Sequence, residues 1–409
     1  MSLPGRNGTG RNGTGRHGTG RNPRVRDLLQ IAWTALFICA PLSAGELPPD
    51  EIQVQLNGYT DDYGLGVWMP VVSVSKRLSP STSVDARALV DAITSASMKS
   101  RFEVDGITSA THTEHGGGHG GLDELRTEVG VGARHRVRNQ TIGVDLLHSG
   151  EHDYASTTLA LGATHPFAEQ NTELQWSILH SWDQVYPTIR TWRRAKDVTT
   201  LSAALTQTLH PRAIGQVEVW YSDLSGMLTD VYQVVTIVDP QRREARLYEP
   251  RHPGRRERKA IGSRLNVKVS ASSAVQLGYR HYWDDWEVRS ETIHGLLRRH
   301  LLSDRMTVEL GVRAYTQSRA FFFQPAYSEP QPLMSVDSKL DSGHSMEYEI
   351  QTEVPARWLC RWLATSPDGG PRLTTHVRYY RRHTSTPDWH SRRQDLDAVL
   401  FGLGLRWAL

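Results

Sequence analysis

The chain is poor in cysteine, since Cys39 and Cys360 are the only two in 409 residues. This excludes a disulfide-stapled scaffold and a cysteine-rich metal site. An excess of one charge is also missing, because 47 Lys and Arg face 44 Asp and Glu and leave a net charge of +3. A nucleic-acid-binding protein usually shows a basic excess, so we expect no nucleic-acid partner. P-loop, dinucleotide, CxxC and haem-attachment motifs are absent as well.

Long hydrophobic runs are missing beyond residue 45, where no stretch approaches the ~20 apolar residues that a membrane helix needs. The mean hydropathy of −0.47 likewise excludes a helical membrane bundle. Neither observation excludes a membrane β-barrel, whose strands are only half apolar.

The N-terminal 45 residues are unlike the rest of the chain. Residues 1–26 carry a basic, glycine-rich five-residue repeat, and a short apolar run over 28–40 follows before the small residues Ser43, Ala44 and Gly45. A basic segment, an apolar core and a small-residue end are typical of a secretory signal peptide. We therefore expect residues 1–45 to be a low-complexity N-terminus and signal peptide, and residues 46–409 to form one domain.

Within 46–409, apolar and polar residues alternate with period two. Val129 and Val131 alternate with Glu128 and Arg134, for example, and the same pattern recurs over 264–271, 306–315, 346–354 and 373–380. Such alternation predicts strands with one apolar and one polar face. A soluble sandwich and an outer-membrane barrel share this pattern, because they differ only in what the apolar face meets.

Three features favour the barrel. Many of the strands run to ten residues or more, which is long for a sandwich. The chain ends on an amphipathic strand at 399–409. Aromatic residues lie near strand ends, as an interfacial girdle requires. These aromatic residues are Trp176, Trp182, Tyr186, Trp220, Tyr221, Tyr279, Tyr282, Trp283 and Trp286. The sequence therefore predicts an all-β fold: a transmembrane, antiparallel, up-and-down β-barrel of about 16 strands, with 14 to 18 open.

The connections between the strands alternate in length. Tight turns are expected at Ser79-Pro80-Ser81, Arg138-Asn139-Gln140, His210-Pro211-Arg212, Ser272-Ser273 and Ser303-Asp304. Longer links are expected near 92–121, 183–196, 222–230, 250–258, 319–343 and 383–395. Short turns on one side and long loops on the other are typical of a barrel with periplasmic turns and external loops. Residues 231–250 fit either a membrane hairpin or an external flap.

Five stretches resemble a bacterial family known as domain of unknown function 3570. They are His152 to Ser156; Ser225 to Tyr232; Tyr248 to Arg251 with Arg255 and Arg256; Tyr279 to Trp286; and Arg313 to Ser318 with Ala320 and Phe322. The resemblance implies an outer-membrane β-barrel without an established activity. It also implies a periplasmic redox setting, with thioredoxin-like or flavin-bearing proteins as partners.

The best metal candidate lies in a His/Gly-rich external loop near 92–121. His112, His115 and His119, with Glu114 among them, lie within eight residues between glycines that let the loop fold back. Three imidazoles can hold a Zn, Cu or Ni ion. The alternative is a glycine-rich surface loop with incidental histidines, and no other cofactor is expected.

Other chemical candidates have simpler explanations. Asp284 and Asp285 between Trp283 and Trp286 could act as paired carboxylates, but solvated acids at a girdle end explain them better. The pairs Ser290 with His294 and Ser342 with His344 do not show a lipase-type set. Cys360 is either packed at the inner rim or a thiol target. Residues expected on the lumen face mix both signs and select no solute: Glu128, Arg134, Glu309, Arg313, Glu347, Glu349, Arg378 and Arg406.

The sequence therefore predicts a non-catalytic, porin-like or scaffold barrel of the bacterial outer membrane. Its expected partners are outer-membrane lipid, the barrel assembly machinery and the redox proteins above. The alternatives are a metal-binding or metal-transporting barrel that uses the histidine loop, and a lipid-modifying enzyme.

Overall fold

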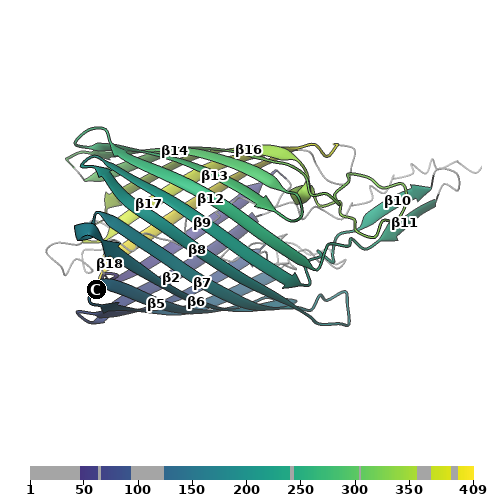
Figure 1. Cartoon of the computed structure of the whole chain (residues 1–409), viewed down its shortest axis with the longest axis horizontal. Coiled ribbons are helices and arrows are strands. Elements are labelled where there is room, and N and C mark those ends of the chain that lie inside the picture. Colours follow the sequence, from purple (N-terminus) through teal and green to yellow (C-terminus); the bar gives the residue numbers. More distant parts are fainter. Residues whose placement is uncertain are drawn as a thin grey trace, which may run out of the picture.

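The computed structural model describes residues 47–62, 66–93, 124–239, 244–303, 305–356, 370–387 and 395–409. Sixteen strands form one closed barrel with antiparallel neighbours (Figure 1). Its strands are β1 (Glu51–Asp61), β2 (Gly66–Ser79), β3 (Thr82–Ile93), β4 (Glu124–Val137), β5 (Gln140–Gly150), β6 (Tyr154–Phe167), β7 (Thr172–Val185), β8 (Arg194–His210), β9 (Ala213–Gly226), β12 (Arg255–Lys268), β13 (Ser273–Asp284), β14 (Arg289–Leu301), β15 (Met306–Gln317), β16 (Gly343–Pro355), β17 (Arg372–Thr384) and β18 (Asp395–Ala408). The predicted barrel of about 16 strands is confirmed.

Alternation along each strand sends apolar side chains outward and polar ones inward. On β4, Val129 and Val131 are 55% and 58% exposed, whereas Arg126 and Glu128 are buried on the opposite face. The first and last strands close the ring, with Glu51 paired to Ala408. A closed sheet leaves no edge strand unpaired, and its apolar outer face suits contact with lipid.

The two ends of the barrel differ, as predicted. At one end, which we call the short-turn end, tight turns join β2 to β3, β4 to β5, β8 to β9, β12 to β13 and β14 to β15, and the described C-terminus lies there (Figure 1). The 3-10 helix η1 (Ala168–Gln170) forms another connection at this end. Of the described residues, the opposite, long-loop end carries 186–193, 227–239, 244–254, 318–342 and 385–387.

Residues 231–250 form part of a flap outside the barrel wall. The hairpin of β10 (Val235–Asp239) and β11 (Glu244–Tyr248) makes its own two-stranded sheet and projects from the long-loop end (Figure 1). The links expected at 222–230 and 250–258 are therefore the two ends of one connection, from β9 to β12. The option of a membrane hairpin is wrong, because β10 and β11 pair with each other outside the barrel sheet.

The aromatic girdle is confirmed only in part. Trp182, Tyr279 and Trp283 are exposed on the outer face near the long-loop end, and Trp176 is exposed on the same face nearer the short-turn end. In contrast, Trp220, Tyr282 and Trp286 are buried together in one apolar cluster. The girdle prediction was wrong for these three residues, because successive residues of a strand point to opposite faces. Position near a strand end therefore does not fix which face a residue occupies.

Helices are minor in this fold. Besides η1, the 3-10 helix η2 (Ser338–Leu340) lies in the connection from β15 to β16. Across the described ranges, no helix is long and apolar enough to cross a membrane.

Candidate functional site

The inward face of β12–β17, which we call the charged wall, carries a ladder of ion pairs between neighbouring strands. Arg298 on β14 reaches Glu309 on β15, with 2.6 Å between Nε and Oε1. Arg378 on β17 holds Glu349 on β16 through two contacts, Nε to Oε2 at 2.9 Å and Nη2 to Oε1 at 3.1 Å. The second of these contacts is a hydrogen bond between charged groups, which is stronger than one between neutral groups. Glu309, Glu349 and Arg378, which the sequence placed on the lumen face, thus all take part in ion pairs there.

A recess of about 380 Å³ opens in the charged wall. Inward-facing glycines make room for the long side chains that line it. A Cβ on Gly278 would lie 2.0 Å from Cε1 of His294, and one on Gly311 would lie 3.3 Å from Cβ of Glu349. The charged lining residues are Glu218, Arg264, Arg280, Arg298, Glu309, Arg313, Glu347, Glu349 and Arg378. Such a lining can bind small polar molecules through both charges.

The inward face of β6–β9, which we call the hydroxyl wall, is built differently. Ser156 and Ser181 are 2.9 Å apart between their oxygens, Ser177 and Ser202 2.7 Å, and Thr200 and Ser222 2.9 Å. Each contact joins hydroxyl groups on adjacent strands. These short side chains satisfy one another within the wall.

Buried charges brace the barrel near the long-loop end. Arg126 Nη2 lies 2.9 Å from Glu128 Oε2, and its Nε donates to Ser149 Oγ at 3.0 Å. On the neighbouring strands, Asp183 accepts a hydrogen bond from Tyr154 Oη at 2.6 Å and lies 3.5 Å from Lys196 Nζ. Buried charges need such partners, because an isolated one is costly.

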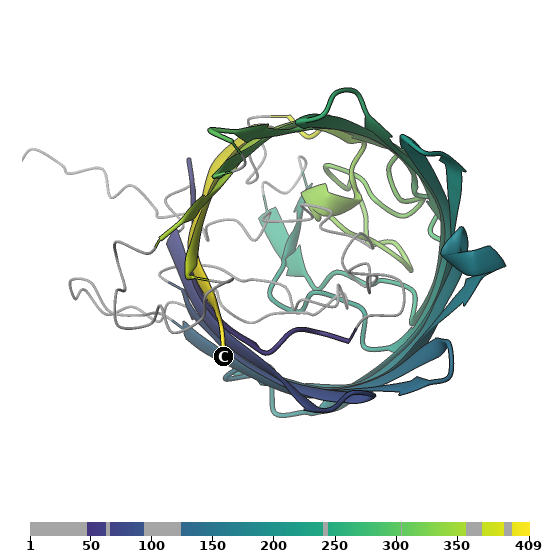
Figure 2. The same ribbon diagram turned by 90° about the vertical axis from the view of Figure 1, so that its left-hand side faces the viewer.

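The described parts of two connections, 227–239 with 244–254 and 318–342, are together called the cap. They lie within the outline of the barrel when it is viewed along its axis (Figure 2). They pack against each other, since Arg251 pairs with Met334 and Val235, Ile237, Tyr327 and Met334 share a buried cluster. The cap therefore covers part of the lumen at the long-loop end.

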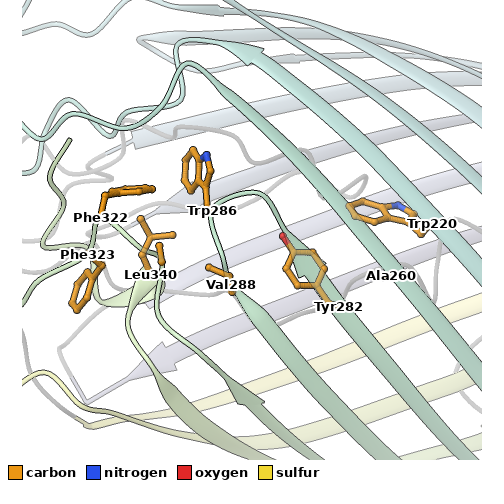
Figure 3. Close-up of a cluster of buried hydrophobic side chains, with 9 residues drawn as sticks. Trp220, Ala260, Tyr282, Trp286, Val288, Phe322, Phe323 and Leu340 are labelled. Carbon is orange, nitrogen blue, oxygen red and sulfur yellow. The ribbon is translucent and has the colours of Figure 1, made fainter. Parts of the chain in front are cut away.

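An apolar cluster anchors the cap to the barrel wall. Trp220 and Tyr282 from the wall share it with Trp286, Phe322 and Phe323 (Figure 3). The Arg256 guanidinium lies 4.3 Å from the Trp286 ring centroid, and its Nη2 lies 2.6 Å from Asp284 Oδ2. Asp284 is thus a buried ion-pair partner, which corrects the expectation of a solvated acid. Its neighbour Asp285 accepts a hydrogen bond from the Glu257 backbone N–H at 2.9 Å.

His252 joins the two connections of the cap. Its Nδ1 lies 3.1 Å from the Leu228 carbonyl oxygen, and its Nε2 lies 3.0 Å from Ser335 Oγ. Because a carbonyl only accepts, Nδ1 carries the proton and Nε2 accepts from the Ser335 hydroxyl. Burial lowers the pKa of His252 below its ordinary value of 6.5, although Asp337 and Asp230 oppose the shift. The ring is therefore neutral at pH 7.

Two further contacts tie the cap to neighbouring loops. Tyr232 donates a hydrogen bond to Asp153, and burial together with that carboxylate raises the pKa of the Tyr232 phenol. Asp341 accepts from Ser385 Oγ at 2.6 Å and from Thr386 Oγ1 at 2.7 Å. The cap is thus held on several sides.

The serine and histidine pairs do not form a lipase-type arrangement. His294 contacts Gln276, with 2.9 Å between the two Nε2 atoms, and Ser342 contacts Asp341 and Ser385. His344 instead lies 5.3 Å from His383, measured between ring centroids.

The predicted metal ligands His112, His115 and His119 lie outside the described residues, as does Cys360. Within the part of the chain that the structure does describe, no group of three His, Cys, Asp or Glu could hold a metal ion. The zinc, copper or nickel site remains a prediction.

Sequence reasoning missed several residues that shape the site. Alternation placed Glu128 on the lumen face, but it did not bring Arg126 to Asp91, because that contact depends on the pairing of β3 with β4. His252 carried no pattern signal, because its partner Ser335 is 83 residues away in another connection. The glycines under the recess could have been found, since Gly262, Gly278 and Gly311 all occupy lumen positions of their strands.

The family described as "Protein of unknown function (DUF3570)" matches residues 37–397. The chain belongs to this family. The stretches that carried the resemblance meet around the long-loop end, where Asp153 binds Tyr232, and Trp286 packs against Phe322. The DUF3570 chain has no match among curated proteins.

Several solved structures are similar to this DUF3570 barrel. A bacterial polysaccharide outer membrane secretin is 8% identical, with 89% of this chain and 100% of that chain covered and a TM-score of 0.48. The siderophore receptor PirA from Pseudomonas aeruginosa is 12% identical over 87% of this chain and 62% of that one, with a TM-score of 0.44. OccK8 (OprE) from the same organism is 8% identical over 87% and 96%, with a TM-score of 0.41. Similarity at this level assigns neither ligand nor activity.

Proposed function

We propose that this DUF3570 protein is a porin-like barrel of the bacterial outer membrane that passes small polar solutes and catalyses no reaction. The observation that carries the proposal is the closed sixteen-stranded wall, apolar outside and polar inside. Barrels of 16 to 18 strands enclose an aqueous channel, whereas eight-stranded barrels are filled by side chains. The long-loop end would face the cell exterior and the short-turn end the periplasm.

The cap argues for a narrow channel. Two connections fold across the mouth and are anchored on the charged wall through the Trp286 cluster (Figure 2). Solutes would pass through the part of the mouth that the cap leaves open. A scaffold role without conduction is the alternative that the same experiment decides.

Conductance of the refolded protein in planar bilayers tests the proposal. We expect small channels from the wild type and larger ones from Trp286→Ala, because that substitution removes the ring that joins the cap to the wall. Trp283→Phe is the matched control, since Trp283 lies on the outer face. Heat-modifiable gel mobility would show that each variant is folded. Folded protein that does not conduct in either form would reject the channel and leave the scaffold.

Location has a separate test. The protein should fractionate with the outer membrane and show the same heat-modifiable mobility after detergent extraction. Recovery in the soluble periplasmic fraction would contradict it. The partners expected from the sequence, namely lipid, the barrel assembly machinery and redox proteins, stay predictions.

A further inference from the structure

Arg313 on β15 and Glu347 on β16 lie directly opposite each other in the recess of the charged wall. The pairs around them are closed, because Arg298 holds Glu309 and Arg378 holds Glu349. Between Arg313 and Glu347, both of which lie in described strands, no ion pair forms within 4.0 Å. This step of the ladder is therefore open.

Glu347 provides the second observation. Its side chain is only 8% exposed, and no hydrogen-bond partner for Oε2 exists among the described residues. Buried carboxylate oxygens nearly always have a donor. An ammonium group that enters the recess would supply one.

Arg313 offers the complementary charge. Its guanidinium lies 5.8 Å from the centroid of the Tyr315 ring, and it forms no ion pair with a described residue. Guanidinium groups bind carboxylates and phosphates with two parallel hydrogen bonds. Residues directly opposite on antiparallel strands have Cβ atoms about 5 Å apart, so one small molecule can contact both side chains.

We propose that the recess binds a small zwitterionic solute, with its anionic group on Arg313 and its ammonium group on Glu347. The volume of about 380 Å³ fits a molecule of the size of an amino acid. Leu296, which also lines the recess, can contact an apolar side chain of such a solute. The inference deepens the proposed function, because it names the solute class that the channel would favour.

Calorimetric titration of the refolded wild type with three matched probes tests the inference. L-leucine carries both charges, N-acetyl-L-leucine only the negative one, and L-leucinamide only the positive one. We expect leucine to bind at least about tenfold more tightly than either derivative, because each derivative loses one charge-assisted hydrogen-bonded contact. Equal binding of leucine and N-acetyl-leucine would overturn the inference, as would no binding of leucine at millimolar concentrations.

Variants assign each charge to its residue. Glu347→Gln should abolish the preference for leucine over N-acetyl-leucine, and Arg313→Met the preference over leucinamide. The control is Glu353→Gln, which changes an inward glutamate of the same strand outside the recess and should leave both preferences intact. Unchanged preferences in Glu347→Gln or Arg313→Met would reject the assignment.

Conductance of the same preparations separates the two proposals. A conducting barrel without preference for the zwitterion contradicts this inference alone. Leucine binding to a barrel that does not conduct contradicts the proposed function alone.

Discussion

Along the chain, the hydroxyl wall precedes the β10–β11 flap and the charged wall follows it. Both walls consist of antiparallel strands of the same barrel. Their lumen chemistry nevertheless differs. In the hydroxyl wall, Ser177 and Ser202 satisfy each other over 2.7 Å. In the charged wall, Arg378 and Glu349 span neighbouring strands with long side chains. The same backbone therefore supports pairs of short hydroxyl side chains on one side, and long charged side chains around a recess on the other.

The difference also explains where the cap is attached. The cluster around Trp286 uses Trp220, Ala260 and Tyr282, which come from β9, β12 and β13. Its wall residues thus lie at the border of the charged wall. The recess and the cluster that anchors the cap therefore lie on the same half of the barrel.

The largest expected difference between the walls is in stability. Glu349→Ala removes one hydrogen bond and one further ion-pair contact from the mostly buried Arg378, and we expect the free energy of unfolding to fall by about 2–3 kcal/mol. Denaturant unfolding of the refolded barrel in detergent measures this change.

Ser177→Ala is the matched change in the hydroxyl wall. It removes one neutral hydrogen bond to Ser202 and should lower the free energy of unfolding by only about 0.5–1.5 kcal/mol. Equal losses in Ser177→Ala and Glu349→Ala would mean that the walls do not differ in energetic terms.

A smaller difference is expected from adding one methyl group to each wall. The Cβ of Gly278→Ala would lie 2.0 Å from His294 Cε1, so the ring must move, at a cost of about 1–3 kcal/mol. In Gly162→Ala, the nearest atoms are the Trp176 carbonyl oxygen at 3.1 Å and Ser177 Cβ at 3.5 Å, and the cost should be lower. Unfolding measurements on both variants provide the comparison.

A double variant tests whether the clash with the His294 ring causes the cost of Gly278→Ala. When His294→Ala is already present, Gly278→Ala should lose most of its penalty, because the clashing ring is gone. A penalty that persists would locate the strain in the backbone.

Sequence reasoning reached the barrel because period-two alternation and turn spacing are local signals. Val129 and Glu128 show their faces in the sequence, and the turn at Asn139 falls where it was expected. Asp284 was misjudged because its partner Arg256 is 28 residues away and on another strand. The open step between Arg313 and Glu347 depends on register between strands, which alternation alone does not fix.

The smallest expected effect concerns pH and the cap above the charged wall. Burial lowers the pKa of His252, so its ring is neutral in the packed cap. The packed cap therefore binds fewer protons than the loosened cap does as pH falls. The contribution of His252 to cap packing is complete above its ordinary pKa of 6.5 and is lost as pH falls through the lower pKa of the packed state. Asp337 and Asp230 weaken this dependence, and Arg256 strengthens it.

Limited proteolysis of the folded protein should therefore cut the cap faster at pH 5 than at pH 7.5. His252→Gln, which does not titrate, should remove most of the difference, while Ser177→Ala in the hydroxyl wall should retain it. If cleavage of the cap in His252→Gln keeps its full pH dependence, another group causes that dependence and His252 does not.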